Sequence, residues 1–223
     1  MELSKIASAV YNDLESGLSG FNANPNISLE QLEDECIETR LAVIKEWYLK
    51  NLIKPHDLMF AINCVDVDCE DPTKCCEDSG KRSMHFEIPQ LMTDLGEDAI
   101  EYIGAADRSQ QYNVYFSPIS VKMHQFKRRR SDEPFVYIEK TPNKNNMFDG
   151  WIYNAPFVKR IAVIAIFKDP RQLEQFDCCN QLDKSYLDFG PISNEVKNRL
   201  TKTKFYYYRQ AAVPPIPNTQ IPR

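Results

Sequence analysis

The sequence predicts an α+β protein with an N-terminal helical hairpin, a mostly antiparallel β-rich centre, a C-terminal helix and an extended proline-rich arm. At both ends of the chain, apolar residues recur at spacings of three and four, which is typical of amphipathic helices. Between residues 58 and 168 the apolar period changes to two, which is typical of strands. Helices that are grouped apart from the strands favour an α+β class.

Two helices are predicted before residue 55. The apolar stripe of the first is formed by Leu3, Ile6, Ala7, Val10 and Leu14. Gly17 and Gly20 are expected to end this helix. The second helix, over about 28–50, begins at a capping box of Ser28 and Gln31 and stops before Pro55. Because only a short polar loop separates them, we expect the two helices to pack as a hairpin.

The central region predicts several strands, at 60–64, 86–91, 112–116, 135–140, 147–153 and 160–168. The strands on either side of residues 141–146 are expected to form a hairpin. Residues 161–167 are apolar on both faces, which predicts a central strand. Residues 94–108 are predicted to form a short helix, and residues 118–130 are ambiguous between strand and helix.

The C-terminal part predicts two more helices and an arm. Asp169 and Pro170 match a helix cap and first turn. The last helix starts near Ser193, and its apolar positions are Ile192, Val196 and Leu200. Four prolines after residue 213 favour an extended arm, since proline cannot donate a backbone hydrogen bond.

The predicted domain organisation is one α+β domain over 1–209, followed by the arm at 210–223. Its helical part covers about 1–55 and 170–209, and its β-rich part covers about 56–169. The length of 223 residues and the 43% of hydrophobic residues suffice for one packed core. No apolar run is long enough to cross a bilayer and no secretory signal is evident, so we expect no membrane contact.

The cysteines are expected to be reduced and free of metal. Their number, seven, is odd, two pairs are adjacent in the chain, and no export signal precedes them. Four of them gather in one acidic segment, as Cys64, Cys69, Cys75 and Cys76. Zinc favours two spaced cysteine pairs instead. The segment also resembles a calcium loop through Asp66, Asp68, Glu70 and Glu77, but Asp71 replaces the glycine that such loops need. A solvated acidic loop is the favoured interpretation.

Signatures of catalysis are missing from the sequence. It contains no nucleophile elbow, no zinc-protease motif and no glycine-rich phosphate loop. The histidines His56, His85 and His124 lack partners at a motif spacing. We therefore expect a protein that is not an enzyme and that needs no cofactor.

A basic run at Lys127, Arg128, Arg129 and Arg130 is the first candidate interaction site. Phosphate backbones and an acidic protein neighbour are both suitable partners for such a run. The net charge of −5 favours the protein neighbour.

The end of the chain supplies the other interface candidates. Tyr206, Tyr207 and Tyr208 are consecutive, so they cannot all face one core, and Arg209 follows them. Tyrosine and arginine are enriched at the centres of interfaces. In the arm, the apolar anchors are Val213, Ile216 and Ile221. Residues 197–223 contain six basic residues and no acidic one, which favours electrostatic contact with a neighbour.

The sequence resembles the ring, or head-to-tail adaptor, proteins of crAss-like tailed bacteriophages. The resemblance rests on the opening YNDLESGLSGFNANPNISLEQLEDECIETRLAVIKEWYLKN, the β-rich centre and the proline-rich end. It implies a virion protein that forms a ring of about twelve copies below the portal, around the DNA channel, after assembly in the host cytoplasm. The implied partners are other copies, the portal and neighbouring tail or ring proteins. DNA would pass through the channel without sequence-specific binding.

Two other function classes remain open. One is a non-virion regulatory protein that contacts nucleic acid through Lys127–Arg130, and salt-dependent DNA binding would identify it. The other is a metal-binding or thiol protein built on the segment of Cys64 to Cys76, and the metal content of the purified chain would identify it.

Overall fold

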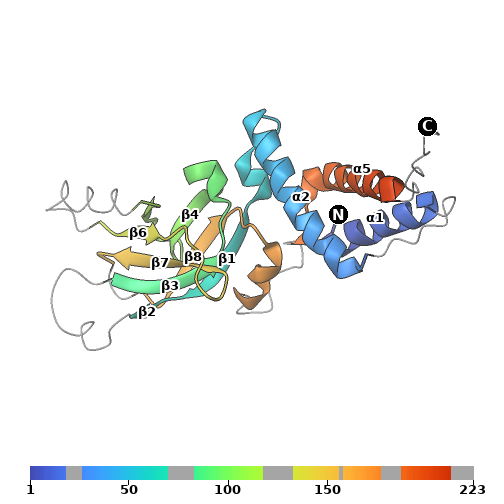
Figure 1. The fold of residues 1–223 in the computed structure, drawn as a ribbon. Helices are drawn as coiled ribbons and strands as arrows, with labels where there is room; N and C mark the ends of the chain where they lie inside the picture. The colour runs from blue at the N-terminus through green and yellow to red at the C-terminus, as the bar shows by residue number, and fades with distance from the viewer. Residues whose placement is uncertain (19–26, 70–82, 118–132, 156–157, 177–186, 212–223) are drawn as a thin grey trace, which may run out of the picture. The chain divides into compact units, whose positions relative to one another are not determined.

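The computed structural model describes residues 1–18, 27–69, 83–117, 133–155, 158–176 and 187–211, and it confirms the α+β class (Figure 1). The chain divides into two compact units, a helical one formed by 1–44 and 188–223 and a β-rich one formed by 45–187. The sequence analysis expected a single domain over 1–209 whose first helical part ends near residue 55. In the structure, the unit changes between Ile44 and Lys45, inside the second helix.

The helical unit contains α1 (Leu3–Leu18), most of α2 (Leu29–Leu49) and α5 (Ser193–Ala211). The predicted stripe of α1 is buried, and the close backbone neighbour of α1 is α5. The described part of α1 ends at Leu18, directly after Gly17, and Gly20 lies outside the described residues. Gly17 belongs to the last turn of the described helix, where a Cβ atom would stand 1.9 Å from Cζ of Phe205. Gly17 is therefore a point of close approach between α1 and α5.

Both ends of α2 have the local structure that the sequence indicates. Gln31 donates its backbone N–H to Ser28 Oγ at 3.1 Å, and Ser28 N–H donates to Gln31 Oε1 at 3.0 Å, which confirms the capping box. At the other end, Asn51 has a φ of 55°, and Leu52 N–H donates to the carbonyl of Trp47 at 2.8 Å. This is a Schellman arrangement, and it ends the helix before Pro55.

The buried face of α2 includes one charged residue. Its buried positions are Leu32, Cys36, Ile37, Arg40, Val43 and Ile44. Arg40 is 1% exposed, and its guanidinium carbon lies 5.5 Å from the centroid of the Phe189 ring. A guanidinium over an aromatic face is stabilised by the ring quadrupole, so Phe189 helps to compensate this buried charge.

The β-rich unit contains two sheets. Their strands are β1 (Phe60–Asp66), β2 (Asp68–Cys69), β3 (Ser83–Pro89), β4 (Ile100–Ala105), β5 (Asn113–Tyr115), β6 (Phe135–Ile138), β7 (Met147–Tyr153) and β8 (Arg160–Ala165). One sheet has the order β1-β8-β4 and the other β2-β3-β7-β6-β5. All described pairings are antiparallel except β5 with β6. The predicted hairpin of β6 and β7 is confirmed, as is the central place of β8.

The structure corrects the prediction of a helix within 94–108. Only Thr93–Ala99 is helical, as the 3₁₀ helix η3, and β4 follows directly. Ile103 of β4 faces the core opposite Val163 of β8. This pairing with β8 overrides the weak local helical pattern, since strand formation depends on cross-strand neighbours. The helix predicted after Asp169 is also a 3₁₀ helix, η4 (Pro170–Phe176).

The two sheets share one core. β3 contributes Met84, Phe86 and Ile88, and these residues belong to the same buried cluster as Ile161 and Val163 of β8. Because side chains alternate along a strand, the intervening residues of the five-stranded sheet lie on its other face. Among the described residues, no helix combines the length and the hydropathy that crossing a membrane requires.

Candidate assembly interface and pockets

The tyrosine run lies at the C-terminal end of α5. Tyr206 and Tyr207 are 62% and 63% exposed, and Tyr208 is half-buried. The rings of Tyr206 and Tyr207 meet edge to face, with centroids 6.4 Å apart. Consecutive residues of a helix point about 100° apart, so the run is divided between the surface and the helix packing as predicted. Arg209 belongs to the same helix, and its side chain lies outside the described part of the chain.

Two basic residues of α5 pair with acidic residues of the other helices in the same unit. Lys197 Nζ lies 3.0 Å from Asp13 Oδ2 of α1, and Lys204 donates to Glu35 of α2. Part of the basic charge of residues 197–223, which was expected to contact a neighbour, is therefore paired within the helical unit. The exposed tyrosine pair is therefore the stronger contact candidate on α5.

The remaining interface candidates lie outside the described residues. These are Lys127, Arg128, Arg129 and Arg130, together with Val213, Ile216 and Ile221 of the arm.

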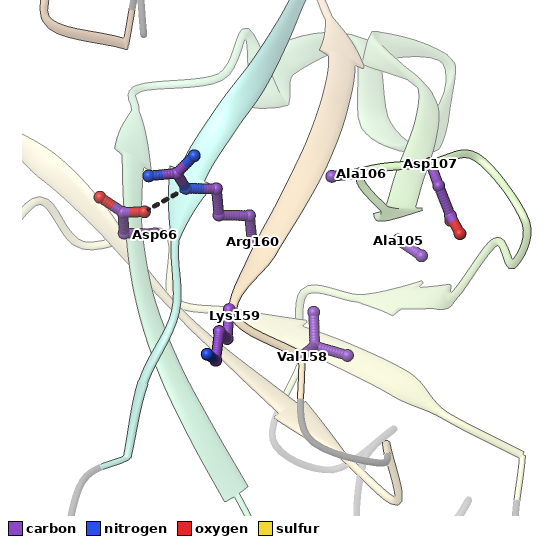
Figure 2. A pocket seen from close by; sticks show the side chains of 7 residues that line it. All are labelled: Asp66, Ala105, Ala106, Asp107, Val158, Lys159 and Arg160. Carbon is purple, nitrogen blue, oxygen red and sulfur yellow. Dashed lines mark hydrogen bonds and ion pairs between the residues drawn. The ribbon is translucent and has the colours of Figure 1, made fainter.

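A hollow of about 580 Å³ opens where β1 and β4 end and β8 begins, and Figure 2 shows its lining. On one side of this lining, Arg160 Nε donates to Asp66 Oδ1 at 2.9 Å, and both side chains are more than half exposed. Asp107, at the rim, accepts hydrogen bonds from the side chain and the backbone of Ser109, which lower the pKa of its carboxyl group. Both carboxylates are thus engaged with donors of the same chain, which suits a polar contact surface better than proton transfer.

A second hollow of about 480 Å³ has a more polar lining, which includes Cys64, His85 and Glu87. His85 Nε2 lies 2.9 Å from Asp149 Oδ1. Asn143 Nδ2 donates to Glu87 Oε1 at 2.7 Å and to Asp149 Oδ1 at 3.1 Å. The imidazole, the amide and the two carboxylates therefore form one hydrogen-bonded group on β3, on β7 and on the turn that precedes β7.

Cys64 contradicts the expectation that every cysteine is reduced. It is disulfide-bonded, and its partner is a cysteine whose side chain lies outside the described part of the chain. Oxidised sulfur is neither a thiolate nucleophile nor a zinc ligand. Cys64 is thus removed from the zinc interpretation, whose other residues, Cys69, Cys75 and Cys76, have no described side chains. Cys36 is a free and buried thiol, as expected.

The described residues contain no group of three or more His, Cys, Asp and Glu side chains arranged to hold a metal ion. Of the calcium-loop residues, Asp66 pairs with Arg160, and Glu70 and Glu77 lie outside the described ranges. His56 contacts Asp57 at 3.0 Å near the surface, and His124 is also outside the described ranges.

The side-chain group around His85 was not predicted from the sequence, because His85 and Asp149 are 64 residues apart in the chain. Only the pairing of β3 with β7 brings them together. The alternation of Phe148, Gly150 and Ile152 with Asp149, Trp151 and Tyr153 was the available signal.

Comparison of the chain with protein-family models and with curated proteins finds no match.

Proposed function

We propose that this chain is a structural protein that assembles with copies of itself into a ring in the head-to-tail connector of a tailed phage. Its partners in this proposal are other copies, the portal and neighbouring tail proteins, and it performs no catalysis. The resemblance of the sequence to ring proteins of crAss-like phages supports a place in the head-to-tail connector. Exposed residues of the described surface support a contact with other copies.

The observation that carries the proposal is the exposed pair Tyr206 and Tyr207. Two adjacent large aromatic side chains in water forgo the burial that stabilises most tyrosines. Such residues form the energetic centre of many protein interfaces. They lie near the end of α5, shortly before a segment whose four prolines predict an extended arm that could reach a neighbour.

A closed ring needs a contact in which two different faces of the same protein meet. The tyrosine pair provides one such face. The opposing face must offer an apolar pocket with a polar rim, since interfaces exclude water from their centre while their edge stays wet.

Location decides between this proposal and the alternatives. Mass spectrometry of purified phage particles should detect the chain in stoichiometric amounts with the portal. Its absence from mature particles would refute the proposal. Salt-dependent DNA binding by the purified chain would favour the nucleic-acid alternative instead.

The contribution of the tyrosine pair is tested by Tyr206→Ser combined with Tyr207→Ser. The melting temperature should stay nearly unchanged, because exposed residues contribute little to folding. Incorporation into particles should fall strongly. The control is Asn194→Ser with Asn198→Ser, two exposed positions at the start of the same helix, which should assemble normally.

A further inference from the structure

The outer face of the five-stranded sheet carries a continuous row of aromatic rings. His85, Trp151, Tyr137 and Tyr115 follow one another across β3, β7, β6 and β5, since each is the register partner of the next. The rings of Tyr137 and Trp151 are stacked, with centroids 5.6 Å apart, and His85 lies 5.6 Å from Trp151 on the other side. All four are partly exposed. We call this row the aromatic row.

A line of carboxylates runs beside the aromatic row on the same face. Glu87 and Asp149 are register partners, and Glu139 N–H donates to the carbonyl of Asp149 at 2.9 Å. Tyr137 and Glu139 are two residues apart, so alternation along the extended chain directs both side chains to this face. Burial first, and then the charge of Glu139, raise the pKa of Tyr137. We call Glu87, Asp149 and Glu139 the acidic line.

The acidic line favours a cationic partner. Carboxylates directly opposite each other on neighbouring strands repel. Among the described residues, Asn143 donates to Glu87 and Asp149, and the His85 ring contacts Asp149. Among the described residues of these strands, no lysine or arginine occupies an outward position. A positive group from a partner would therefore meet a negative potential over aromatic rings.

The chemistry of this face points to arginine. A guanidinium pairs with a carboxylate through a planar fork and at the same time stacks on an aromatic ring, which a lysine ammonium does less well. A phosphate-bearing partner such as nucleic acid would be repelled by the acidic line.

We propose that the aromatic row and the acidic line together bind an arginine-rich segment of a second copy of this chain, namely Lys127–Arg130. The charges are complementary, because four consecutive cations face three carboxylates. The choice of a second copy as the partner rests on the proposed function. The preference of this face for a cationic partner does not depend on the proposed function.

The test measures binding of a synthetic peptide that comprises residues 122–131 to the full chain. The receptor carries Trp47→Phe, so that Trp151 is the single tryptophan and its fluorescence reports on the face. A second receptor additionally has Lys127, Arg128, Arg129 and Arg130 replaced by glutamine. The peptide should quench or shift the emission of both receptors, and raising the salt concentration should weaken binding severalfold.

Matched variants identify the residues that bind. Glu87→Gln and Glu139→Gln should each lower the affinity for the peptide roughly threefold to tenfold, as expected for partly exposed charge pairs. Glu97→Gln, at an exposed carboxylate of η3, should leave the affinity unchanged. A peptide with its arginines replaced by glutamine should lose measurable binding.

Three outcomes would overturn the proposal. Binding only to the receptor that lacks its own basic run would mean that the face takes the segment of the same chain. A single-stranded oligonucleotide that binds more tightly than the peptide would point to a different class of partner. Absence of peptide binding to either receptor would remove the face as a cationic site. If the chain is nevertheless found in particles, the proposed function stands without this contact.

Discussion

At the scale of single residues, Cys36 has the most perturbed acid–base chemistry among the described groups. It is fully buried on α2. Burial first, and then the charges of Glu33 and Glu35, raise the pKa of its thiol from 9.0 to about 12. The folded state therefore keeps its proton where the unfolded state has lost it, so stability falls as the pH rises above 9.

We expect this thiol to lower the free energy of unfolding by about 1.4 kcal/mol between pH 8 and pH 10. Urea unfolding of the wild type and of Cys36→Ala at both pH values measures it. The alanine variant is less stable at pH 8 because of the cavity, but its loss between the two pH values should be smaller by that amount. Equal losses in the two proteins would show that the thiol does not titrate in the folded state as described.

Cys64 makes a second residue-scale prediction, on oxidation state. Alkylation in denaturant without prior reduction should add at least two fewer groups than alkylation after reduction, because the disulfide of Cys64 withholds two thiols. In Cys64→Ser the difference between the two measurements should be smaller by two groups. A full set of alkylated thiols in the unreduced wild type would restore the reduced state that the sequence suggested.

At the scale of elements, the contact of α1 with α5 depends on the missing side chain of Gly17. Gly17→Ala should destabilise the protein by about 1–3 kcal/mol, because the new methyl group displaces the Phe205 ring. In a Phe205→Leu background the penalty should shrink or reverse, since alanine favours a helix over glycine by about 0.5–1 kcal/mol. Thermal unfolding of the four proteins of this cycle measures the coupling, and additive effects would exclude the contact.

Elements were predictable where local signals and long-range packing agree. A few neighbouring residues are enough to predict the capping box of Ser28, the buried stripe of α1 and the alternation of β7. β4 was missed because its strand character depends on β8, which follows some sixty residues later in the chain. The close packing at Gly17 could not be predicted, because glycine is common both at helix ends and at close contacts, and only the position of Phe205 shows the contact.

The candidate sites were predictable to a smaller extent. The exposure of Tyr206 and Tyr207 could be predicted from the run of three consecutive tyrosines, because one helix face cannot bury three consecutive side chains. The aromatic row needed the register of four strands, which no single segment of the sequence contains. The disulfide of Cys64 was missed because an odd cysteine count and adjacent pairs describe the set of cysteines and say nothing of one bond.

At the scale of the whole molecule, folding and assembly should depend on different parts of the chain. Deletion of residues 212–223 should change the melting temperature little, because scattered apolar residues among prolines cannot offset an ordering cost of about 1–2 kcal/mol per residue. Incorporation into particles should fall. Failure of the truncated chain to fold, or its normal assembly, would each contradict this separation.

The helical unit is formed by two segments, residues 1–44 and 188–223. The residues of the β-rich unit, 45–187, lie between these two segments in the sequence. A ribosome therefore releases α1 long before it makes α5, and at 5–20 residues per second the delay is roughly ten to forty seconds. During that interval Ile6, Val10 and Leu14 lack the helix that α1 packs against. The β-rich unit can fold meanwhile, so nascent chains should acquire their sheets first and remain dependent on chaperones at their amino-terminal end until synthesis is complete.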